Sequence, residues 1–458
     1  MSTKDHPHRR PNILFLMADQ FRHDHLGLFG RHPVQTPHLD ALARRSRVFT
    51  QCISNAPVCV PARIGLATGM MPHRLGSLNN HSYLPGTATT HYQLLRDDDY
   101  RVGLVGKVDL AKPDPYNGID GQRPSVFRWG FTHPVECEGK MHAGKGRTPL
   151  GPYTAWLAEQ GLLERFCDDY ASRRNNYALA CDDSVLPDEA FADCWIGRQA
   201  AQWLRHCPAD FPFFHMVSFV GPHDPFDPPS SYAERFRNAA VNPALPGDVV
   251  GHHAINRVHT QDPDLIARTR RQYCASIAAI DDAVGEIMTA LKQRDDADNT
   301  YVVFTSDHGE MLGDFGCYTK SVPYEGALRI PLMIAGPDIA AGTSDALVEI
   351  IDLHPTVLDL AGVRQDRPVD GRSLAPLLHG AGDHHRDDQV AMLHGWSCLR
   401  SREHKLVVNH GTGGRPELYD LIDDPDELHN RAEERPEVVR RLQSQLNRRL
   451  HLDGAWHR

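Results

Sequence analysis

The chain has 458 residues, of which 41% are hydrophobic and 24% charged, a balance typical of folded globular proteins and not of disordered or collagen-like chains. Its formal net charge is -10, from 49 Lys and Arg against 59 Asp and Glu. This surface argues against binding to nucleic acid or to an anionic membrane. No run of about 18 apolar residues occurs, so no membrane span is predicted.

The first residues are basic and polar, and only a short apolar stretch, Ile13 to Ala18, precedes Asp19. This stretch is too short for the core of a secretory signal peptide. Ten cysteines occur without a CxxC pair, which does not indicate a disulfide framework. We therefore expect a cytoplasmic protein.

Apolar runs and helical periodicities alternate along most of the chain. Continuous apolar runs predict strands buried on both faces, and Thr36 followed by Pro37 predicts a helix with Thr36 as its N-cap. The expected elements, in chain order, are a strand at 12–17, a helix at 36–45, strands at 101–105 and 213–219, a helix at 263–293 and a strand at 301–305. This alternation predicts an α/β fold with a large, mostly parallel sheet sandwiched by helices.

The pattern changes after Gly371, where short apolar segments at 390–393, 405–408 and 418–421 alternate with turn residues. An amphipathic helix is expected at about 434–450. We therefore expect two domains, residues 1–370 and a smaller α+β domain of residues 371–458. Residues 113–200 are rich in Pro, Gly, Arg and Asp and predict loops and helices over the strand ends.

Polar residues follow several of the predicted strands directly. They are Asp19 and Gln20, Lys107, His223, and Asp307 with His308. In parallel sheets, ligands bind at the carboxyl ends of the strands. The sequence therefore predicts a polar site at this edge of the sheet.

Residues 57–69 (PVCVPARIGLATG) contain the pattern C-x-P-x-R, which resembles the sulfatase signature in which the cysteine, here Cys59, is oxidised to Cα-formylglycine. A buried thiol at a helix start is the alternative for Cys59. Further blocks that resemble the same family, in order, are PNILFLMADQ, TPHLDALARRS, MPHRLGS, GPHDPF, FTSDHGEMLGDFG, KSVPYEGALRIPLMI, DGRSLAPLL and ELYDLIDDPDELHNRAE. The resemblance to sulfatases, within the alkaline phosphatase superfamily, covers nearly the whole chain and implies an alkaline phosphatase-like fold for residues 1–370.

The resemblance implies one divalent metal ion held by Asp19, Gln20, Asp307 and His308, together with the formylglycine oxygen at Cys59. These Asp-Gln and Asp-His pairs are similar to those of choline sulfatases and phosphonate monoester hydrolases, whereas many sulfatases have Asp-Asp and Asp-Asn. An imidazole ligand moves the site toward borderline metals, so that Ca²⁺ and Mn²⁺ are both candidates. An ordinary loop-end histidine is the alternative for His308.

The resemblance also implies roles for four further residues. Arg63, one helical turn after Cys59, would fix the hydrated aldehyde through its planar fork. Lys107 and Lys320 would bind the transferred oxyanion, and solvated lysines are the alternative for both. His223 would protonate the leaving alcohol or bind substrate, because the imidazole pKa lies near working pH.

Two more positions are candidates for substrate binding. Asn80 is a possible extra oxyanion donor, and Asn79 competes with it for that role. Asp109 stands where the family's G-K-x-H segment has a histidine. A carboxylate near an anion is unfavourable unless it is paired, protonated or faces a cationic part of the substrate.

These residues together predict a metal-dependent hydrolase of sulfate monoesters. One hydroxyl of the hydrated aldehyde would attack sulfur, and the other would expel the group as the aldehyde re-forms. The alternatives are hydrolysis of phosphonate monoesters or phosphodiesters at the same site, and an inactive binding homologue with unconverted Cys59. The expected partners are a small anionic ester and a formylglycine-generating enzyme, with no nucleic acid or membrane, and self-association is left open.

Overall fold

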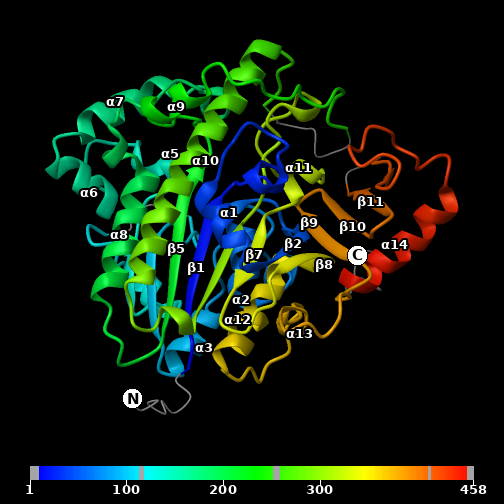
Figure 1. Ribbon diagram of the computed structural model, residues 1–458. Helices are drawn as coiled ribbons and strands as arrows, with labels where there is room; N and C mark the ends of the chain where they lie inside the picture. The colour runs from blue at the N-terminus through cyan, green and yellow to red at the C-terminus, as the bar shows by residue number, and fades with distance from the viewer. Residues whose placement is uncertain (1–9, 113–117, 251–257, 411–413, 451–458) are drawn as a thin grey trace.

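The computed structural model describes residues 10–112, 118–250, 258–410 and 414–450. An eight-stranded sheet crosses the molecule, and a four-stranded sheet lies beside it (Figure 1). The strands of the large sheet are β1 (Asn12–Asp19), β2 (Ser46–Ile53), β3 (Arg101–Gly106), β4 (His133–Glu136), β5 (Phe213–Pro222), β6 (Thr300–Ser306), β7 (Leu332–Ala335) and β8 (Gly342–Glu349). Their order is β4-β3-β5-β1-β6-β7-β2-β8. All neighbours are parallel except at β7, which is antiparallel to β6 and β2. The predicted α/β class with a mostly parallel sheet is confirmed.

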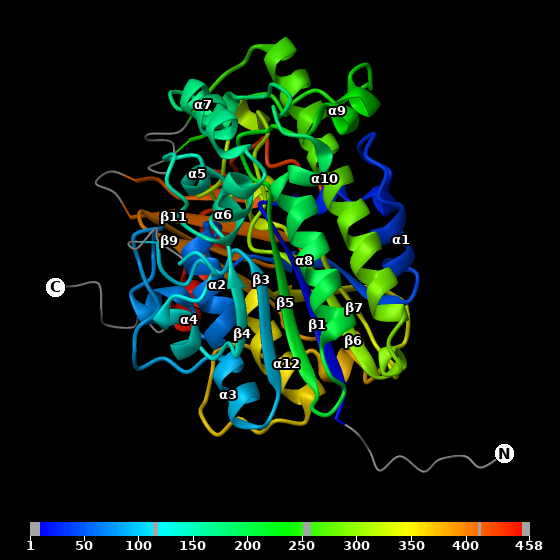
Figure 2. The ribbon, with the colours of Figure 1, turned by 90° about the vertical axis from the view of Figure 1, so that its left-hand side faces the viewer.

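Helices cover both faces of this sheet (Figures 1 and 2). One face packs against α1 (Pro37–Ala43), α8 (Ala192–His206) and α10 (Pro263–Lys292), and the other against α2 (Cys59–Thr68), α3 (His91–Asp97) and α12 (Leu353–Ala361). The remaining helices are α4 (Pro124–Arg128), α5 (Lys140–Ala143), α6 (Pro152–Glu159), α7 (Leu163–Arg173), α9 (Ser230–Phe236), α11 (Glu325–Leu328), α13 (Ala375–Leu378) and α14 (Pro436–Leu450). All eight residues of β1 are buried, because alternate side chains enter the cores on the two faces.

The small sheet is antiparallel, in the order β12-β11-β10-β9. Its strands are β9 (Gln389–Leu393), β10 (Trp396–Arg400), β11 (His404–Asn409) and β12 (Glu417–Asp420). The predicted boundary between residues 370 and 371 falls between α12 and α13 and stays a prediction. Among the described residues, no helix is both long and apolar enough to cross a membrane.

The predicted strands and helices are all present, but the sheet also contains strands for which no residue range was predicted. Strands β2, β7 and β8 complete one side of it, and β4 extends the opposite edge from within residues 113–200. The prediction of loops and helices alone for that segment was therefore wrong. Strand β4 has only four residues and begins with the exposed His133, so it carries no clear apolar run.

The start of α1 differs from the prediction. Thr36 occupies the N-cap position, but its hydroxyl accepts a hydrogen bond from the Gly27 N–H (2.9 Å) and donates to Asp40 (2.9 Å) instead of capping the helix. The buried Asp281 of α10 accepts the N–H groups of His38 (3.1 Å) and Leu39 (2.8 Å). A carboxylate from another helix therefore caps α1.

We expect Asp281→Ala to lower the free energy of unfolding by about 1–2 kcal/mol, because two helix N–H groups lose their acceptor. Urea denaturation followed by circular dichroism measures the change. The matched control is Asp282→Ala, which removes the neighbouring exposed carboxylate. Equal unfolding midpoints for the two variants would contradict the capping role of Asp281.

Candidate active site

The site lies where the carboxyl ends of four neighbouring strands meet. Strands β3, β5, β1 and β6 are adjacent, so Lys107, His223, Asp19 and Asp307 reach the same edge. Cys59 comes to this edge as the first residue of α2. The structure thus brings together residues that lie up to 288 positions apart, Asp19 and Asp307, as the sheet order requires.

Asp19, Cys59, Asp307 and His308 form a fully buried group whose potential ligand atoms all lie within 4.8 Å of one another. The Sγ of Cys59 lies 3.3 Å from His308 Nε2 and 3.8 Å from Asp19 Oδ1. His308 Nδ1 faces the carbonyl of Gly309 at 2.9 Å, so Nε2 is the nitrogen that faces the group. Two carboxylates and one imidazole fit a divalent cation such as Ca²⁺ or Mn²⁺, and the group is consistent with a metal site beside a formylglycine cysteine.

The electrostatic surroundings of Cys59 are strongly positive. Burial by itself would raise the pKa of this thiol, but the charges of Lys107, Lys112 and Lys320 outweigh burial and hold the pKa well below its usual value. Burial instead raises the pKa of the Cys52 thiol well above the usual value, with the nearby carboxylate of Asp352 adding to the rise. Since both thiols are fully buried, the difference between their pKa values comes from the charges of the neighbouring side chains.

Arg63 follows Cys59 by one turn of α2 and donates hydrogen bonds to three residues of the site. Its Nε donates to Asp307 Oδ2 at 2.8 Å, and its Nη1 donates to the carbonyl of Lys107 (2.7 Å) and to Ser218 Oγ (2.9 Å). Its Nη2 makes no hydrogen bond within the described residues and lies 3.8 Å from Asp19 Oδ2. This buried donor is available for an oxygen at position 59, and the predicted contact with the hydrate stays a prediction.

Lys107 connects the buried group to Asp109. Its ammonium group pairs with Asp19 and lies 3.1 Å from Asp109 Oδ2, and Lys112 contacts the same Asp109 oxygen at 3.1 Å. Although burial raises the pKa of Asp109, the two lysines lower it below its usual value. Asp109 is thus a paired carboxylate, one of the conditions under which it can stand beside an anion. Sequence reasoning missed Lys112, which its i,i+3 spacing from Asp109 could have indicated.

Lys320 joins His223 and Gln20. Its ammonium group contacts the carboxamide oxygen of Gln20 and lies 2.6 Å from His223 Nε2. The Gln20 amide nitrogen donates to Asp224 (3.2 Å) and Glu310. Gln20 has a φ of 71°, a left-handed conformation that is strained for a residue with a Cβ and is typical of functional sites. Its role as a metal ligand stays a prediction.

Lys140, which sequence reasoning also missed, holds the chain around His223. Its buried ammonium group donates to the carbonyls of His223 (3.1 Å) and Pro225 (2.7 Å) and pairs with Asp227. His223 Nδ1 in turn faces the carbonyl of Asp224 at 2.7 Å. No sequence motif around Lys140 indicates this contact, because its partners are about 85 residues away.

The two asparagines differ in position. The carboxamide oxygen of Asn80 accepts the N–H of Val60 at 3.1 Å, next to Cys59. Asn79 is exposed, and its oxygen accepts the N–H of His81 at 2.8 Å. Of the two, Asn80 therefore stands at the site, and its role as an oxyanion donor stays a prediction.

A mostly parallel sheet with a buried Asp–Cys–Asp–His group at its carboxyl edge places the chain among α/β proteins of the alkaline phosphatase superfamily. The sulfatase family profile matches residues 11–363, and the profile for the C-terminal part of N-sulphoglucosamine sulphohydrolase matches residues 313–452. The chain belongs to the sulfatase family.

Similar proteins support this membership over the whole chain. An arylsulfatase of Clostridium perfringens is 27% identical, over 92% of this chain and 90% of its own length. A choline-sulfatase of Rhizobium meliloti is 30% identical, over 93% of this chain and 83% of its own length. Among solved structures, a phosphonate monoester hydrolase of Agrobacterium radiobacter has a TM-score of 0.80 and 25% identity, covering 97% of this chain and 96% of that one.

Proposed function

We propose that this sulfatase-family hydrolase cleaves sulfate monoesters after conversion of Cys59 to formylglycine. The proposal rests on the buried group of Asp19, Cys59, Asp307 and His308, in which the charges of nearby lysines lower the pKa of the Cys59 thiol. The arylsulfatase and choline-sulfatase among its relatives support sulfate esters as the substrate class.

Asp19, Asp307 and His308 would hold the divalent ion. When bound, this ion and the formylglycine hydrate together supply an activated oxygen nucleophile. Arg63 keeps the carboxylate of Asp307 in place through its Nε, and its Nη2 would orient an oxygen at position 59. Because the side chains of Arg63 and Asp307 are already held in place, they need little reorganisation during the reaction.

Lysine and histidine side chains would act on the transferred group and on the leaving alcohol. Lys107 and Lys320 would neutralise the oxygens of the transferred group, since both ammonium groups border the buried cluster. As an imidazolium, His223 would give the proton on Nε2 to the leaving alcohol, while its Nδ1–H stays bonded to the Asp224 carbonyl and the Lys320 ammonium group, which lies 2.6 Å from Nε2, turns to the transferred group. Lys140 would keep His223 in position through its backbone carbonyl.

Hydrolysis of phosphonate monoesters or phosphodiesters is the second candidate function. It is favoured by Asp109 in place of the family's histidine, and by the structural likeness to a phosphonate monoester hydrolase. The same charges would suit either substrate, because both reactions transfer a tetrahedral oxyanion group.

Intact mass and a substrate panel test these proposals together. After co-expression with a formylglycine-generating enzyme, we expect a mass about 18 Da below that of the encoded chain, as the CH₂SH of Cys59 becomes CHO. The converted protein should hydrolyse an aryl sulfate with a higher kcat/KM than a phenylphosphonate ester. The reverse preference would favour the second candidate, and converted, metal-loaded protein inactive on sulfate, phosphonate and phosphodiester alike would contradict both.

A further inference from the structure

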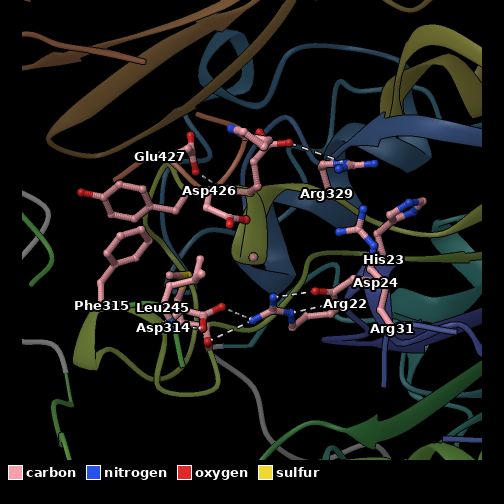
Figure 3. A pocket seen from close by; sticks show the side chains of 15 residues that line it. Arg22, His23, Asp24, Arg31, Leu245, Asp314, Phe315, Arg329, Asp426 and Glu427 are labelled. Atoms are coloured by element: carbon pink, nitrogen blue, oxygen red, sulfur yellow. Dashed lines mark hydrogen bonds and ion pairs between the residues drawn. The ribbon is translucent and has the colours of Figure 1, made fainter. Parts of the chain in front are cut away.

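A small polar cavity lies between the segment after β1, the segment around α11 and the loop that follows β12 (Figure 3). Its lining does not include Asp19, Cys59, Asp307, His308 or any of the four lysines at the candidate active site. The cavity measures about 70 Å³, which is room for a few water molecules or one small ion.

One side of the cavity carries side-chain nitrogens that lack hydrogen-bond partners. Figure 3 shows His23, Arg31 and Arg329 gathered there. The Nδ1 of His23 and the Nε of Arg329 are buried and make no hydrogen bond within the part of the chain that the structure describes. His23 is only 8% exposed. Since nearly all buried polar atoms in native proteins have a partner, these two call for a ligand or ordered water.

The positive charge on this side is incompletely balanced. Arg329 Nε lies 3.6 Å from Glu325, too far for a hydrogen bond, and Glu325 is shared with Arg400 and Lys405. For the side chain of Arg31, no ion pair occurs within the described ranges. Burial lowers the pKa of His23 to about 3, with the charges of Arg329 and Arg31 contributing and Asp24 opposing them. His23 is therefore a neutral imidazole, which can donate one hydrogen bond without adding charge.

The buried and half-buried acidic groups that line the cavity already have cationic partners. These pairs are Asp24 with Arg22 (2.7 Å), Asp314 with Arg22 (2.7 Å) and Arg270 (2.6 Å), Glu325 with Arg400 (2.9 Å), and Glu427 with Lys405. Asp426 is exposed. Glu427 Oε1 makes no hydrogen bond within the described residues, but it is ion-paired with Lys405. The four paired carboxyl groups thus already have cations, whereas nitrogens of His23 and Arg329 lack partners, which favours an anion over a cation.

We propose that this cavity binds one tetrahedral oxyanion, of the sulfate or phosphate class, through His23, Arg31 and Arg329. The exposed Arg31 presents a planar donor pair that matches two oxygens of such an ion. Arg329 offers its Nε–H, since its Nη2 already donates to the Thr50 carbonyl, and the imidazole of His23 supplies a further donor as its Nδ1–H tautomer. A halide can accept from the same donors, but a single atom does not match the parallel N–H pair of a guanidinium group as two oxygens do. This site is separate from the catalytic proposal and does not depend on it.

The direct test locates the ion in the full chain. Crystals soaked in selenate, a sulfate analogue with an anomalous signal, should show a selenium peak at about 4 Å from His23 Nδ1 and Arg329 Nε, with selenate oxygens at about 3 Å from these nitrogens. The peak should be absent from crystals of Arg31→Ala. No peak in the wild-type cavity, or an undiminished peak in Arg31→Ala, would overturn the proposal.

Calorimetric titration gives the affinity, with inorganic sulfate and inorganic phosphate in separate arms and chloride as the reference anion at equal ionic strength. We expect Arg31→Ala to weaken oxyanion binding at this site by about tenfold or more, through loss of a charged donor. The control is Arg440→Ala, which removes an exposed arginine of α14. Tighter binding of one oxyanion identifies the source, whereas equal binding by the two variants, or chloride binding as tight as either oxyanion, would overturn the proposal.

Discussion

Cys59→Ala is expected to lower kcat/KM for an aryl sulfate by at least about 10⁴-fold, because it removes the only atom from which the nucleophile can be made. The fold should remain, since Ala suits the first turn of a helix and is only slightly smaller than Cys. Thermal unfolding and circular dichroism check the fold, and intact mass shows that the loss of about 18 Da no longer occurs.

Cys52→Ala is the matched control. Cys52 is also fully buried, but its thiol pKa is raised by burial and it lies in β2, away from the lysines of the site. We expect this variant to keep its activity and to show the same mass loss as the wild type. Full activity of Cys59→Ala would contradict the mechanism.

Asp307→Asn is expected to lower kcat/KM by at least about 100-fold and to reduce the bound metal per chain. The change preserves shape but removes one of the two carboxylate charges that offset a divalent ion. Asp307 also accepts hydrogen bonds from Arg63 Nε (2.8 Å) and from the N–H groups of Gln20 (3.0 Å) and His308 (2.9 Å). An amide can replace some of these contacts, so a folded protein is expected.

Metal analysis by mass spectrometry, before and after addition of Ca²⁺ or Mn²⁺, separates lost metal from lost chemistry. The control is Asp298→Asn, an exposed carboxylate shortly before β6. If Asp307→Asn retained both full activity and full metal content, the assignment of Asp307 as a ligand would fail. Recovery of activity at high metal concentration would support it, because weakened binding can be overcome by mass action.

Most of the main strands could be predicted because they are apolar on both faces. The runs that became β1, β5 and β6 needed no tertiary information. Strands β2 and β4 could not be predicted in the same way, since exposed or half-buried residues interrupt their apolar pattern. The true cap of α1, Asp281, also escaped prediction, because it comes from a helix about 240 residues later.

The sequence by itself determined the type of sheet, the polar residues at the strand ends and the resemblance carried by C-x-P-x-R and its companion blocks. Each of these depends on neighbouring residues, and local patterns record such neighbours directly. The tertiary structure decided which charges meet. It paired Asp109 with Lys107 and Lys112 and placed Gln20 against Lys320. It also gathered His23, Arg31 and Arg329 around one cavity. Such pairings depend on strand order and loop paths, and electrostatic energies depend on distances that no local pattern encodes.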